Sequence, residues 1–208
     1  MKKELLDINT WARKDHYHFF SQFDEPFFGI TVDADCTKAY NDSKSQNFSF
    51  FLKYLHCSLV AINSIDALKL RIENDQVWLY DQINASPTIN RPDGTFGFAY
   101  IDFYKNFDDF SSVAKKEIER IHTSVGLDPA GPGQNVIHYS SLPWIKFTSI
   151  SHARSFKFKD SCPKISFGKI FDQNERKMMP ISIHVHHALV DGFHIGLFIE
   201  KFQKLLNL

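Results

Sequence analysis

Four of the ten histidines lie in one short stretch, "HVHHALVDGFH", at residues 184–194. Side chains alternate between the two faces of a strand, so His187 ends a row of apolar residues while His184 and His186 point to the opposite face. Imidazole is the side chain whose ordinary pKa lies nearest neutral pH, and it is also a common metal ligand. The chemistry open to this stretch is therefore proton transfer or metal binding.

Three interpretations of the stretch compete. In a structural interpretation, Asp191 caps the following helix, Gly192 relieves the turn and His187 is a satisfied core histidine. In a metal interpretation, His184 and His186 bind a metal from one strand face, but no obvious acidic or cysteine partner lies near them in the sequence. In a catalytic interpretation, His187 is a general base and Asp191 holds the corner. The residues alone leave these alternatives open.

A strand over 178–187 and a helix over 192–206 are predicted to position this stretch. Further helices are predicted over 11–20, with Asn9 or Thr10 as the cap, over 48–62 and over 107–122. Strands are predicted over 27–35, 68–72, 77–80, 96–103, 135–144, 145–150 and 164–171, and a loop over 126–134. This mixture favours an α+β fold: one domain over 1–208, a two-layer α/β sandwich with a mainly antiparallel mixed sheet.

Composition narrows the class of protein. The 208 residues include 24 basic and 24 acidic side chains, so no net field would attract nucleic acid or an anionic membrane. No apolar run reaches the length of a membrane span, and the N-terminus does not read as a secretory signal. Cys36, Cys57 and Cys162 are odd in number and far apart, which argues against a zinc cage or a disulfide framework. A location in the reducing cytoplasm is expected.

The histidine stretch resembles a motif of the trimeric chloramphenicol acetyltransferases, His-His-Ala-x-x-Asp-Gly-Phe-His, through its phenylalanine and third histidine. These enzymes belong to the CoA-dependent acyltransferase superfamily. Other segments agree in order with the family: "NTWARKDHYHFF" with its opening helix, "SSLPWIKFTSI" with its Ser-x-x-Pro-Trp segment, and "ISFGKIF" with "MMPISIHVHH" as the hairpin before the histidine. The resemblance covers nearly the whole chain and is weakest at 36–50 and 122–138.

The resemblance implies the CoA-dependent acyltransferase fold and a chloramphenicol O-acetyltransferase, an antibiotic-inactivating enzyme that uses acetyl-CoA as co-substrate and no metal. It implies that His187 is the general base, and that Ser140 donates to the oxyanion of the tetrahedral intermediate. It also implies that Asp191 pairs with Arg13 in a structural ion pair that orients His187. The enzyme would be a homotrimer with its active sites at subunit interfaces.

The resemblance also assigns the residues that bind the two substrates. Phe20, Phe28, Phe96 and Ser166 fall at positions that line the pocket of the small-molecule acceptor, and Lys169 falls where a lysine approaches CoA.

Three residues depart from the family's pattern. Phe20 stands where the family often has a tyrosine, and His152 and Lys164 fall near positions that are usually apolar. The alternatives are therefore an acetyltransferase of the same fold that acts on another small hydroxyl or amine acceptor, or a non-catalytic ligand-binding relative.

Overall fold

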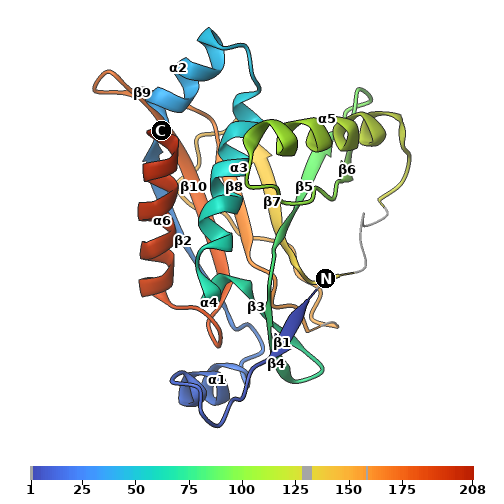
Figure 1. Ribbon diagram of the computed structural model, residues 1–208, viewed down its shortest axis with the longest axis vertical. Coiled ribbons are helices and arrows are strands. Elements are labelled where there is room, and N and C mark those ends of the chain that lie inside the picture. Colours follow the sequence, from blue (N-terminus) through green and yellow to red (C-terminus); the bar gives the residue numbers. More distant parts are fainter. Residues whose placement is uncertain (1, 128–132, 158) are drawn as a thin grey trace.

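The computed structural model describes residues 2–127, 133–157 and 159–208, and its largest unit is a mixed β-sheet (Figure 1). In spatial order the sheet contains β2 (Phe27–Asp35), β10 (Arg176–His186), β8 (Lys164–Gly168), β7 (Val136–Leu142), β5 (Asn84–Asn90) and β6 (Phe96–Phe98), and β9 (Phe171–Gln173) pairs with β10. The pairs β5–β7 and β7–β8 are parallel and the others are antiparallel. The predicted mixed, mainly antiparallel sheet is confirmed.

A smaller sheet joins β1 (Lys3–Leu5), β4 (Gln76–Tyr80) and β3 (Leu70–Glu73). The β3–β4 hairpin turns through Asn74 and Asp75, which both have positive φ. Asparagine and aspartate tolerate this conformation better than most residues, so two-residue hairpin turns favour them. The two strands of this hairpin are those predicted over 68–72 and 77–80, with bounds that differ by one or two residues.

Four helices contact the larger sheet, and they are α2 (Thr37–Ser45), α3 (Phe50–Asn63), α5 (Phe107–Thr123) and α6 (Gly192–Leu206). The short helix α4 (Asp66–Lys69) contacts β4 of the smaller sheet, and Figure 1 shows α1 (Lys14–Phe20) beyond the lower end of the larger sheet. Figure 1 shows α3 and α6 side by side in front of the sheet, and the main hydrophobic core lies between these helices and the strands. None of the helices in the described part of the chain is long and apolar enough to cross a membrane.

The segments on either side of β2 differ from the predictions. Asn9 and Thr10 do not cap α1, because both bind the Asp7 carboxylate in a turn that precedes the helix. The helix consequently begins at Lys14. Helix α2 was not predicted. The sequence feature that marks its start is an aspartate two residues before the helix. In the structure the Asp35 carboxylate accepts a hydrogen bond from the backbone N–H of Thr37, the first residue of α2.

Three predicted strands differ from the structure, and the one predicted over 164–171 is divided into β8 and β9. The segment 145–150 is not a strand; it lies along the sheet, where the buried Phe147 ring occupies the space beside Gly168. The strand predicted over 96–103 ends at Phe98. The loop predicted over 126–134 lies partly outside the described residues.

Candidate active site

His187 lies in the turn between β10 and α6. Its backbone N–H donates to the carbonyl of Pro26, and its ring lies against Phe20 and Phe28, with centroid distances of 3.9 Å and 4.4 Å. The ring Nδ1 is 3.2 Å from the carbonyl oxygen of Val190. A carbonyl can only accept a hydrogen bond, so Nδ1 carries the proton of the neutral ring and Nε2 has a lone pair. His187 is thus held in the tautomer that can take a proton at Nε2.

The corner that holds His187 is tied to the N-terminal segment. The Arg13 guanidinium forms an ion pair with Asp191 and also donates to the backbone carbonyl of His187 at 3.2 Å. The same Asp191 carboxylate accepts from the backbone N–H groups of Phe193 and His194, so it caps α6 as well. Asp191 therefore acts as the helix cap of the structural interpretation and also forms the expected ion pair with Arg13.

Electrostatics keep Asp191 ionised. Partial burial acts to raise the pKa of its carboxyl, but the neighbouring His194 and the Arg13 guanidinium outweigh burial and lower it on balance.

Ser140 lies on the opposite face of the sheet from the helices. It pairs in register with Ser166 on β8, which pairs with Ser182 on β10, so three hydroxyl side chains form a row across neighbouring strands. Ser140 is half-buried, whereas Ser166 and Ser182 are fully buried. Phe96, which is 41% exposed, lies on the same face at the β6 edge of the sheet.

The chain does not bring His187 and Ser140 together. His187 lies five residues beyond Ser182 on β10, or about 16 Å at 3.3 Å per residue, while Ser140 lies two strands away from β10, or about 10 Å. The expected residues therefore form two groups. We call His187, Phe20 and Phe28 with Arg13 and Asp191 the histidine half-site, and Ser140, Ser166 and Phe96 the serine half-site. Lys169 belongs to neither group; it is exposed just after β8 ends.

A row of polar side chains lies beside the serine half-site on the same sheet face. His138 on β7, Lys164 on β8 and His184 on β10 pair in register with one another, and Gly29 on β2 pairs with His184. A Cβ atom on Gly29 would lie 2.3 Å from the His184 ring, so the missing side chain makes room for that ring. The alternation of residues shows which side chains of one strand share a face. It does not show which strands are neighbours, so the row could not be predicted from the sequence.

A cavity of about 220 Å³ opens along this row. We call it the polar cavity; its lining includes Glu25, Gly29, His152, Arg154, Lys164 and His184. Lys164 forms an ion pair with Asp160. The His152 and His184 rings pack edge to face, with their centroids 4.8 Å apart. Burial lowers the pKa of His152 to about 4 and also lowers that of His184, so both rings are neutral at pH 7.

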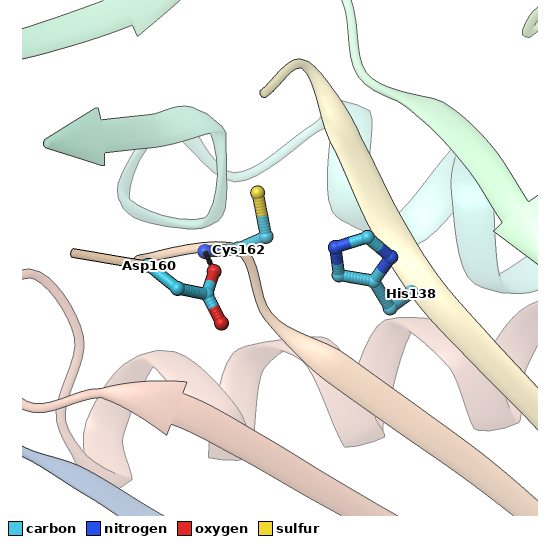
Figure 2. A group of neighbouring side chains, drawn as sticks. All are labelled: His138, Asp160 and Cys162. Atoms are coloured by element: carbon cyan, nitrogen blue, oxygen red, sulfur yellow. Dashed lines mark hydrogen bonds between the residues drawn. The ribbon is translucent and has the colours of Figure 1, made fainter. Parts of the chain in front are cut away.

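Sequence reasoning missed one group of metal-ligand types: His138, Asp160 and Cys162, drawn in Figure 2, whose ligand atoms lie within 4.8 Å of one another. One Asp160 oxygen accepts from the Cys162 backbone N–H, and the other pairs with the Lys164 ammonium. Burial raises the pKa of the Cys162 thiol, whereas metals bind the thiolate. The ammonium also repels a metal cation, so this group is better explained as a satisfied polar cluster.

The two histidines of the metal interpretation have protein partners of their own. His184 Nδ1 lies 3.3 Å from the Ser182 hydroxyl, and His186 Nδ1 accepts a hydrogen bond from the Ala188 backbone N–H at 3.3 Å. The two rings are thereby oriented without a metal.

Solved structures with related folds define the class of protein. The cubic core of a pyruvate dehydrogenase multienzyme complex superposes with a TM-score of 0.70 over 92% of this chain and 85% of that chain, at 14% sequence identity. A solved chloramphenicol acetyltransferase superposes with a TM-score of 0.93 at 31% identity, covering 99% of this chain and 100% of that chain. The fold is that of the CoA-dependent acyltransferases.

The sequence then identifies the family. The chloramphenicol acetyltransferase family model matches residues 1–203, and the chain belongs to that family. Chloramphenicol acetyltransferase 3 of Escherichia coli is 27% identical over 100% of this chain and 98% of its own length. Chloramphenicol acetyltransferase of Proteus mirabilis is 24% identical over 96% of this chain and 93% of its own length. The chain is therefore an acyltransferase of this family, which implies acetyl-CoA as co-substrate.

Proposed function

We propose that the protein transfers the acetyl group of acetyl-CoA to a hydroxyl group of a small acceptor, with His187 as general base. The observation that carries this proposal is the fixed tautomer of His187. Its Nδ1 donates to the Val190 carbonyl, so Nε2 is left to accept a proton. The rings of Phe20 and Phe28 pack against the imidazole and hold it in place.

The proposed reaction uses His187 twice. Nε2 takes the proton of the acceptor hydroxyl while the hydroxyl oxygen bonds to the thioester carbonyl carbon. The carbonyl oxygen becomes an oxyanion, to which the Ser140 hydroxyl donates a hydrogen bond. When the intermediate collapses, the carbon–sulfur bond breaks and the protonated imidazole returns its proton to the CoA sulfur. The products are the acetyl ester and CoA.

The proposed active site lies between two subunits of a homotrimer. The separation of His187 from Ser140 within one chain supports this arrangement, because the reaction needs both groups at one carbonyl. Each site would combine the histidine half-site of one subunit with the serine half-site of the next. Lys169 is proposed to contact CoA. We place the enzyme in the cytoplasm, where its free cysteines Cys36, Cys57 and Cys162 would stay reduced.

Two kinds of acceptor are candidates. Chloramphenicol is supported by the names of the relatives at 24–31% identity, and its acetylation would inactivate the antibiotic. A different small hydroxylated acceptor is supported by the polar side chains of His152 and Lys164 in the polar cavity.

The proposal is tested by the release of CoA thiol from acetyl-CoA, with and without acceptor. We expect saturable turnover that falls by about 10²–10⁴-fold in His187→Ala, the usual contribution of a general base. His122→Ala, at an exposed histidine on α5, is the matched control and should retain full activity. Unchanged turnover in His187→Ala would exclude the mechanism, and tight acceptor binding without turnover in the natural protein would favour a non-catalytic relative.

A further inference from the structure

The polar cavity lies on the same sheet face as Ser140, the residue that the proposed mechanism places at the reacting carbonyl. His138 and Ser140 are two residues apart on β7 and share a face, as do Lys164 and Ser166 on β8. Same-face neighbours on a strand are about 7 Å apart. An acceptor whose hydroxyl reacts beside Ser140 therefore extends over this row of polar side chains.

The charges in the polar cavity are already balanced. The Lys164 ammonium pairs with Asp160, and the Arg154 guanidinium pairs with Glu25. Each cation thus has its own carboxylate, and a charged ligand group would have to separate one of these pairs. The cavity consequently favours a ligand without net charge.

Three buried polar atoms in or beside the polar cavity have no hydrogen-bond partner among the described residues, and one of them is Nε of Arg154. Ser166 is fully buried, and its Oγ makes no hydrogen bond to the described residues; the same is true of the buried Nε2 of His152. An apolar ligand surface would leave these atoms unpaired, and an unpaired buried polar group weakens binding by about tenfold or more. Hydroxyl groups both donate and accept, so they can satisfy a serine oxygen and an imidazole nitrogen alike.

We infer that the acceptor is a neutral polyhydroxylated compound of the sugar or cyclitol class, whose non-reacting hydroxyls bind His152 and Ser166 beside the Lys164–Asp160 pair. This inference rests on the proposed acetyltransferase function and concerns the acceptor alone. One hydroxyl of the acceptor reacts at the carbonyl, and the others pair with the unpartnered polar atoms.

The first test measures thiol release by the natural protein with four kinds of acceptor: neutral hexoses and inositols, chloramphenicol, a hydroxy acid and an amino alcohol. We expect at least one neutral polyol to give a kcat/KM about tenfold or more above that of the other three. A preference for chloramphenicol, or for either charged acceptor, would overturn the inference.

The second test replaces one of the unpartnered polar groups. His152→Leu should lower kcat/KM for the preferred polyol by about tenfold and raise that for chloramphenicol, so the ratio of the two values inverts or narrows. His122→Leu, on the exposed side of α5, should leave the ratio unchanged. Light scattering and circular dichroism of both variants establish that they assemble and fold. A folded His152→Leu variant with an unchanged ratio would contradict the inference.

Slow hydrolysis of acetyl-CoA by water separates this inference from the function on which it rests. If hydrolysis depends on His187 while no polyol is acetylated, the inference is wrong and the acetyltransferase proposal stands. If His187→Ala changes neither hydrolysis nor any acetyl transfer, both are wrong.

Discussion

At the scale of single residues, the hydrogen bond from His187 Nδ1 to the Val190 carbonyl decides what the imidazole can do. The acceptor of this bond lies three residues further on, inside the turn between β10 and α6. The sequence motif predicts a base at His187, but the tautomer depends on the fold of that turn. Every residue type has a backbone carbonyl, so the sequence does not show which carbonyl accepts this hydrogen bond.

Ser140 provides a residue-scale prediction. We expect Ser140→Ala to lower kcat by about 10²–10³-fold with little change in KM for acetyl-CoA, because an oxyanion donor acts only in the transition state. The assay is steady-state thiol release.

The neighbouring serine is the control for this prediction. Ser141→Ala removes a hydroxyl that instead contacts the Tyr54 hydroxyl on the helix side of the sheet, and it should keep kcat within a few fold. Equal losses in the two variants would mean that Ser140 has no special role at the carbonyl.

At the scale of elements, the segment before α1 and the start of α6 are joined by one ion pair. Arg13→Met removes the cation that binds both Asp191 and the His187 carbonyl, and the Arg13 side chain is only 13% exposed. We expect a loss of about 1.5–3 kcal/mol in the free energy of unfolding, the usual value of hydrogen bonds to charged groups. We also expect kcat to fall more than KM rises, since the orientation of His187 changes. Urea unfolding and steady-state kinetics measure the two effects.

A surface arginine supplies the comparison. Arg176 approaches Asp35 at 3.6 Å and its side chain is 67% exposed, so Arg176→Met should change stability by less than about 1 kcal/mol and leave kcat unaltered. If Arg13→Met behaves like Arg176→Met, the ion pair does not orient His187.

Element boundaries show where sequence patterns suffice. Helix α6 and strand β2 have the bounds that were predicted, because their apolar periodicity is uninterrupted. The segment 145–150 has a strand-like composition, yet it contributes the Phe147 ring that packs beside Gly168 instead of joining a ladder. Helix α2 is polar and short, so its apolar pattern is weak and only the Asp35 contact marks its start.

At the scale of the whole molecule, register between distant strands creates both half-sites. The predicted residues around His187 lie close together because Phe28 and His187 come from the paired strands β2 and β10 or their ends. The sequence could not predict that Ser140, Ser166 and Phe96 form a separate group, because this follows from the order β10–β8–β7–β5–β6 in the sheet. That order depends on contacts between residues far apart in the chain.

Buried histidines make the stability of the whole fold depend on pH. Burial, with a further contribution from Arg154, lowers the pKa of His186 to about 4, and burial lowers that of His152 to about 4. The unfolded chain binds these protons near the ordinary pKa of about 6.5, so stability is complete above that pH and falls as the pH decreases from about 6.5 through about 4. Urea midpoints should decrease from pH 7.5 to pH 5, and His186→Asn should weaken the dependence. A constant midpoint over this range would refute the prediction.

The central claim is that one subunit supplies His187 and another supplies Ser140 to the same active site. It is tested most directly by mixing two inactive subunits. His187→Ala and Ser140→Ala chains carrying different tags are co-expressed, and mixed oligomers that bear both tags are purified. In a trimer that contains both kinds of chain, one of the three interfaces joins an intact His187 to an intact Ser140, so activity should recover to about a third of the natural value. Mixed oligomers that form but stay as inactive as either parent would contradict an active site between subunits.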